Sequence, residues 1–137
     1  MATCVLTILS LALYFTKVMP LSISEYAARF ILYLDGKEMN TGRWIVGFIT
    51  NFSLGTFFGI MSAFLFKISG REEKCVKIGT IGVGCWFFQL AIVPFLSHEV
   101  AKYCTFDMAI PYFILYLIWA YVAVEIIIRF MDFKESK

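Results

Sequence analysis

The stretch 44-WIVGFITNFSLGTFFGIMSAFLF-66 decides the fold, because its 23 residues contain no charged side chain. A helix of this length rises about 1.5 Å per residue and spans roughly 35 Å, slightly more than the roughly 30 Å hydrocarbon core of a bilayer. A helix is expected because an open sheet would leave unpaired backbone groups in lipid. We therefore predict a transmembrane helix over residues 44–66.

Two later stretches repeat this pattern. Residues 76–96 carry only Lys77, close to their start, and residues 108–128 carry only Glu125. Each stretch is 21 residues long, which suits one passage through the hydrocarbon core. We predict that both are transmembrane helices.

The apolar stretch over residues 2–19, whose only charge is Lys17, also has the length of a secretory signal peptide. However, no Lys or Arg precedes it, and Lys17-Val18-Met19-Pro20 lacks the small residues of a cleavage site. We therefore expect an uncleaved helix, with a short basic leader before Met1 as an alternative. The sequence then predicts an all-α, four-helix integral membrane bundle that forms a single domain over residues 1–137.

The composition of the whole chain supports a membrane class. Hydrophobic residues make up 61% of the 137 residues and charged residues 16%, against about 45–50% and about 25% in soluble domains. A small soluble domain exposes a large surface for its volume, and so few charges could not cover it. This excludes a soluble globular protein, a disordered chain and a nucleic-acid-binding module. The expected partner is the lipid bilayer.

The basic residues predict the orientation. Four lie in the connection 67–77 and three in the tail over 129–137, whereas the connection between the last two helices has only Lys102. Because cytoplasmic loops carry the excess of Lys and Arg, we expect a multipass protein of the cell membrane with both termini in the cytoplasm. The three basic residues within 20–43 oppose this assignment, since this loop would lie outside.

Residues 23–34 predict a short amphipathic helix between the first two spans. Ser22-Ile23-Ser24-Glu25 fits a capping box, in which the serine oxygen accepts from a free backbone N–H and the glutamate reaches back. Apolar residues follow at helical spacing, Glu25 and Arg29 form a potential ion pair on the opposite face, and Asp35-Gly36 supplies a stop. At about 12 residues the helix is too short to cross a bilayer. We expect it to lie at the outer interface or to cap the bundle, with packing alone as the other interpretation.

Small and polar residues recur every four positions in the stretch 44–66, and so form one narrow stripe on the predicted helix. Its members are Gly47, Asn51, Gly55, Gly59 and Ala63. Small residues let membrane helices approach closely, where dispersion rather than the hydrophobic effect holds them together. We expect the stripe to pack against another helix of the same chain, with a second subunit as the alternative.

Polar residues inside the predicted spans are the remaining candidates for function. Asn51 and Gln89 lie at matching depth, roughly 5–6 Å from the midplane, so an amide pair or a place in a substrate path is expected. Glu125 lies near the inner edge of the hydrocarbon, and an intramembrane acid is by default a functional candidate. Because Arg129 follows one turn later, we expect a structural ion pair, with proton or ion handling as the alternative.

Enzyme chemistry finds little support in this sequence. The four cysteines form no C-x-x-C motif, and His98 is the only histidine, which disfavours a dithiol enzyme, a bis-histidine haem and a zinc site. His98-Glu99 looks like a surface pair that could also sense pH. We expect no cofactor and no catalytic residue. The favoured role is structural or accessory, and the alternative is a small transporter or channel subunit acting as a homo-oligomer.

The layout of the chain resembles a group of uncharacterised small four-helix inner-membrane proteins of Gram-positive, often anaerobic, bacteria. The similarity covers nearly the full length, through the segment ending in Asp35-Gly36, the match Phe57-Phe58-Gly59-Ile60 and the third helix opening Lys77-Ile78-Gly79. The chain departs from the group in its short N-terminus, without a basic stretch. The resemblance implies a bacterial multipass protein and carries over no catalytic residue.

Overall fold

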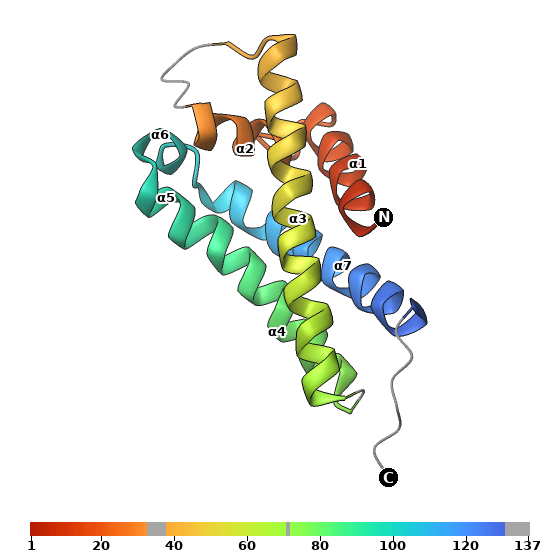
Figure 1. Ribbon diagram of the computed structural model, residues 1–137. Helices are drawn as coiled ribbons and strands as arrows, with labels where there is room; N and C mark the ends of the chain where they lie inside the picture. Colours follow the sequence, from red (N-terminus) through yellow and green to blue (C-terminus); the bar gives the residue numbers. More distant parts are fainter. Residues whose placement is uncertain (33–37, 71, 131–137) are drawn as a thin grey trace.

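The computed structural model describes residues 1–32, 38–70 and 72–130. This part of the chain consists of helices and the turns that connect them, and it contains no strand (Figure 1). The helices are α1 (Ala2–Phe15), α2 (Ile23–Leu32), α3 (Thr41–Ser69), α4 (Lys74–Phe87), η1 (Phe88–Ile92), α5 (Val93–Leu96), α6 (His98–Ala101) and α7 (Phe106–Phe130). Here η1 is one turn of π-helix that joins α4 and α5 into a continuous helix. The tail beyond Phe130 and the predicted stop Asp35-Gly36 lie outside the described residues.

Three helices of the described chain are long and apolar enough to cross a membrane. They are Thr41–Ser69, Lys74–Leu96 and Phe106–Phe130. They contain the predicted stretches 44–66, 76–96 and 108–128 and extend them by up to three residues at an end. Asn40 caps α3, because its side chain accepts a hydrogen bond from the N–H of Arg43 at 3.0 Å. The prediction of these three apolar helices is confirmed.

The first helix is shorter than predicted. Helix α1 has 14 residues and is about 21 Å long, less than the roughly 30 Å of the hydrocarbon core. It ends at Phe15, where the Thr16 hydroxyl bonds back to the Ala12 carbonyl at 2.9 Å and Lys17 adopts a left-handed backbone with φ 59°. Pro20 also disfavours helix at the residue before it. The helix predicted over 2–19 therefore ends at Phe15, and α1 is shorter than the three candidate membrane spans of the described chain.

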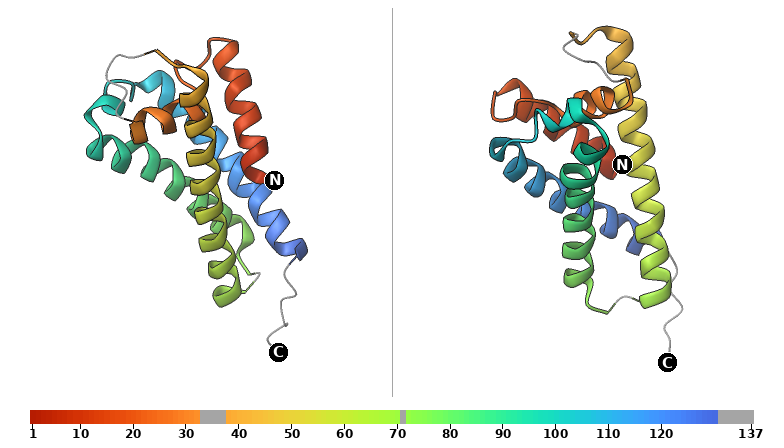
Figure 2. Two further views of the ribbon diagram at one scale, coloured as in Figure 1. Left: turned by 45° about the horizontal axis from the view of Figure 1, so that its top comes forward. Right: turned by 90° about the vertical axis from the view of Figure 1, so that its left-hand side faces the viewer.

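The long helices are arranged in two layers. Figure 2 shows α3 running antiparallel to the α4–α5 helix, with α7 crossing behind them and α1 beside α7. Helix α4 packs along α7, and α7 packs along α1. At the α4–α7 contact a Cβ on Gly82 would lie 3.2 Å from the Leu117 Cα, so the glycine permits the close crossing. The fully buried Tyr112 and the nearly buried Trp119 of α7 belong to the core between the layers.

Helix α2 lies inside one end of the bundle and not on its surface. It packs mainly against α3, and also against α6 and α1. Tyr26 and Ala28 are fully buried, and the charged residues Glu25 and Arg29 are only 4% and 8% exposed. The short helix is formed as predicted, and its burial against α3 at one end of the molecule agrees with the expectation that it caps the bundle. Its charged side chains can be buried because they neutralise each other.

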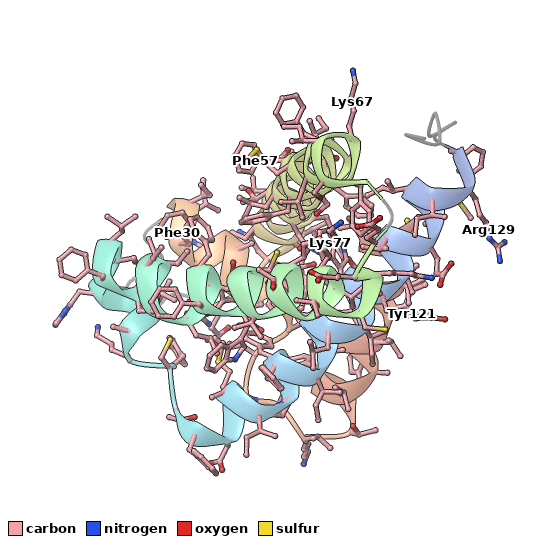
Figure 3. The ribbon with its side chains drawn as sticks, turned by 90° about the horizontal axis from the view of Figure 1, so that it is seen from below. Phe30, Phe57, Lys67, Lys77, Tyr121 and Arg129 are labelled. Carbon is pink, nitrogen blue, oxygen red and sulfur yellow. The ribbon has the colours of Figure 1, made fainter. Side chains whose placement is uncertain are left out.

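The outer surface of the long helices is apolar. Helix α3 exposes a series of large apolar side chains along its length, among them Ile49, Phe57, Ile60, Phe64 and Ile68. Figure 3 shows Phe57 and, at the end of α3, Lys67 pointing away from the other helices. Apolar side chains without protein neighbours are normal where lipid surrounds a helix. This surface and the lengths of the helices support a membrane protein.

Candidate functional site

The buried charges of the structure lie on α2. The Arg29 Nη2 donates to the Glu25 Oε1 at 2.9 Å, and the Arg29 Nε lies 3.3 Å from the same oxygen. The two side chains are 10% and 5% exposed. The Arg29 guanidinium also lies 4.9 Å from the centre of the Tyr103 ring, a cation–π geometry. The potential Glu25–Arg29 pair predicted from the sequence is thus formed, although inside the protein.

The capping box at the start of α2 is half formed. The Glu25 N–H donates to the Ser22 Oγ at 3.2 Å, as the S-x-x-E pattern predicts. The Glu25 carboxylate binds Arg29, the other group it was expected to approach. The N–H of Ile23 donates to the Ser10 Oγ at 2.7 Å, which ties the start of α2 to α1. Two serine hydroxyls therefore satisfy backbone donors of the first turn of α2.

A π-helical turn faces α2 across the core. In η1 the Val93 N–H bonds to the Phe88 carbonyl, five residues back. In this register the next N–H would bond to the Gln89 carbonyl, but residue 94 is proline and has none. The Tyr26 hydroxyl donates to this carbonyl at 2.5 Å. The tyrosine of α2 thus satisfies the backbone group that Pro94 leaves open, and π-turns are frequent at functional sites.

Aromatic rings and a thiol surround this hydrogen bond. The Tyr26 and Tyr112 rings meet edge to face, with centroids 5.8 Å apart. The Cys104 Sγ lies 3.8 Å from the Tyr26 hydroxyl. Burial raises the pKa of the Tyr26 phenol far above its ordinary value, and burial also raises the pKa of the Cys104 thiol, against a smaller lowering by the bond to Tyr26. Both groups stay protonated and neutral at physiological pH.

Four buried polar atoms in and beside this cluster have no hydrogen-bond partner among the described residues. They are the Ser24 Oγ, the Glu25 Oε2, the Ser97 Oγ and the Tyr112 hydroxyl. Buried polar atoms are normally paired, since leaving one unpaired costs about 1–3 kcal/mol. We call the group of Ser24, Glu25, Tyr26, Arg29, Ser97, Cys104 and Tyr112 the polar cluster. Its unpaired atoms are acceptors and donors available to water or protons.

Asn51 and Gln89, which were expected to pair, line the same small cavity. Its volume is about 20 Å³, and it lies among α1, α3, α4 and α7, with room for about one water molecule. The Asn51 Nδ2 donates instead to the Thr7 Oγ1 at 2.8 Å, and the Thr7 hydroxyl donates to the Thr3 carbonyl at 2.7 Å. Among the described residues no direct bond joins the two amides. The expected Asn51–Gln89 pair is therefore not formed, and Asn51 is bonded to Thr7 of α1 instead.

The stripe on α3 packs within the chain along its first half. A Cβ on Gly47 would lie 3.1 Å from the Ala28 Cβ and overlap the Ser24 carbonyl, so α2 rests directly on this glycine. A Cβ on Gly55 would overlap the Thr3 side chain of α1. Gly59 has no neighbour within 4 Å of such a Cβ. Gly59 and Ala63 instead line an open groove of about 300 Å³ between α3 and α7.

Glu125 has a different partner from the one predicted. Its Oε1 accepts a hydrogen bond from the Lys74 Nζ at the start of α4, and the two side chains are 29% and 35% exposed. Arg129 is exposed and points away from the bundle in Figure 3. The ion pair that Glu125 forms is therefore with Lys74 and not, as was expected, with Arg129. The reason is the packing of α4 along α7, which brings the first turn of α4 beside the end of α7.

Within the described chain, no group of three or more His, Cys, Asp or Glu residues could hold a metal ion. All four cysteines are free. Comparison with protein-family models, with curated proteins and with solved structures found no match to this chain. The polar cluster on α2 is therefore the candidate site on structural grounds alone.

The sequence contained a signal for this cluster. Between the two charges of α2 stand Ala27 and Ala28, and Ser24 precedes them. Spaced three and four residues apart, these small residues share one face of the helix, and such a face permits close packing against another helix. The Tyr26–Gln89 bond joins residues that are 63 positions apart in the sequence, so no local sequence pattern predicts it.

Proposed function

We propose that this chain is a multipass protein of a bacterial cytoplasmic membrane with a structural or accessory role and no enzymatic one. The observation that supports the proposal most directly is the contrast between its surface and its interior. Apolar side chains cover the long helices, whereas the charged residues of α2 are bonded to each other inside. Several interior polar groups hold one helix to another, as Asn51 does with Thr7 and Tyr26 with the Gln89 carbonyl.

In this proposal both termini lie in the cytoplasm, which requires that the 14-residue α1 also carries the chain across the membrane, as a fourth passage beside the three long helices. The α3–α4 connection and the end of α7 lie at one end of the molecule in Figure 1, and the Lys74–Glu125 bond links them. Lys67 stands at this end and Lys102 at the other. The basic 67–77 connection supports the cytoplasmic assignment of the first end.

Cysteine labelling tests the topology. In a variant without native cysteines, Lys67→Cys should react with a membrane-impermeant maleimide only after the cells are permeabilised. Lys102→Cys should react in intact cells. The chain should also stay in the membrane fraction after carbonate extraction. Extraction into the soluble fraction would overturn membrane insertion, and labelling of both sites in intact cells would overturn the topology.

A second candidate function is transport as a small oligomeric subunit, and the unpaired atoms of the polar cluster favour it. The Glu25 Oε2 and the Tyr112 hydroxyl are buried and have no hydrogen-bond partner among the residues that the structure describes, and intramembrane charges mark ion and proton pathways. Proton uptake into liposomes under an imposed potential separates the two candidates. A structural protein gives no flux above empty liposomes. A transporter gives flux that Glu25→Gln abolishes and the peripheral Glu125→Gln leaves intact.

A further inference from the structure

A large cavity lies at the end of the bundle where α1 ends and α7 begins. It is open, has a volume of about 1050 Å³, and is lined by both of these ends. Its walls include the rings of Tyr14, Phe15 and Phe106. Because Phe106 starts a spanning helix, this cavity lies at the level where the hydrocarbon core meets the headgroups. Aromatic residues are enriched at that level of membrane proteins.

Two unpaired charges of opposite sign line this cavity. Lys17 follows α1 and Asp107 lies in the first turn of α7. Both are exposed, and among the described residues neither makes an ion pair or a side-chain hydrogen bond. Lys17 is held by a turn in which its own N–H bonds to the Tyr14 carbonyl at 3.0 Å. The cavity thus offers one cation and one anion above apolar walls.

We propose that this cavity binds the headgroup of a zwitterionic phospholipid with a primary ammonium group. The lipid phosphate pairs with the Lys17 ammonium, and the lipid ammonium donates hydrogen bonds to the Asp107 carboxylate. The acyl chains then run down past Ile110, which is 47% exposed below the charged pair. An anionic lipid with a glycerol headgroup meets Lys17 equally well, but it brings no cation for Asp107.

The proposal rests on the membrane location proposed above and makes a separate measurement possible. The full-length protein is purified in a mild detergent and titrated with phosphatidylethanolamine or with phosphatidylglycerol of the same acyl chains. Native mass spectrometry then counts the bound lipids. We expect the wild type to prefer phosphatidylethanolamine by about fivefold, the scale of one exposed ion pair.

The variants assign the two contacts. Asp107→Asn should remove the preference by weakening only phosphatidylethanolamine, whereas Lys17→Gln should weaken both lipids. The double exchange Lys17→Asp with Asp107→Lys should restore the preference. Lys67→Gln, at the opposite end of the bundle, is the matched control and should change nothing. Thermal melting in the same detergent checks that each variant is folded.

Two results would overturn this site. One is a wild type that binds both lipids equally, which leaves a membrane protein with unselective lipid contacts. The other is a preference that persists in Asp107→Asn together with unchanged binding of both lipids in Lys17→Gln, which moves the selectivity elsewhere. A chain that binds neither lipid and stays soluble without detergent contradicts the membrane location instead, so the two proposals fail in different ways.

Discussion

Replacing Gly47 by alanine should destabilise the protein, although alanine is the better helix former. A Cβ at this position would overlap the Ser24 carbonyl of α2 and lie 3.1 Å from the Ala28 Cβ. A backbone atom cannot rotate away, so α2 must shift as a whole. Overpacking of this kind costs about 1–3 kcal/mol, and the gain in helix propensity offsets roughly 0.5–1 kcal/mol of it. The net loss in the free energy of unfolding should be about 1–2 kcal/mol.

The same stripe supplies the control. Gly59 also lies in α3, but a Cβ there would meet nothing within 4 Å. Gly59→Ala should therefore keep the propensity gain and be neutral or stabilising. Thermal melts in detergent and unfolding titrations with a denaturing detergent, both followed by circular dichroism, measure the difference. A Gly47→Ala variant that is as stable as Gly59→Ala would refute the close contact between α2 and α3.

Three further predictions follow from the polar groups. Tyr26→Phe should lower the free energy of unfolding by about 1–2 kcal/mol. The loss should be smaller in a Pro94→Ala background, because the alanine N–H can bind the Gln89 carbonyl in place of the tyrosine. A double-mutant cycle measures this coupling. Alkylation of Cys104 should be slower at neutral pH than alkylation of the exposed Cys75. The alkylation rate of Cys104 should also keep rising with pH beyond the range in which an ordinary thiol titrates, because burial raises the pKa of Cys104. Glu125→Gln should leave the melting temperature almost unchanged, because its ion pair is open to solvent.

The long helices could be predicted because a single property decides them. A run of about 20 residues with at most one charge has few alternatives to crossing a membrane. The end of α1 could not be predicted in this way. It depends on a turn in which the N–H groups of Val18 and Met19 both bond to the Leu13 carbonyl. Hydropathy does not distinguish such a turn from another turn of helix.

The polar partners could not be predicted because they depend on how helices cross. Depth along a helix follows from the sequence, and Asn51 and Gln89, which were expected at matching depth, line one cavity. Which atom fills the bonding position depends on neighbours far away in the chain, here Thr7, 44 residues from Asn51. For Glu125, the local candidate Arg129 was visible, whereas Lys74 lies 51 residues away.

The burial of α2 shows why an amphipathic pattern alone does not decide between a membrane surface and a protein interior. Burying an ion pair costs several kcal/mol unless its geometry is good, and the Glu25–Arg29 bond satisfies one carboxylate oxygen only. The helix is held inside by backbone contacts instead, through Gly47 below it and the Gln89 carbonyl beside it. These contacts fix the end of the bundle that carries the polar cluster. The opposite half, where Gly59 borders an open groove, lacks them. A function that requires helices to move therefore has more freedom at the groove than at the buried charges.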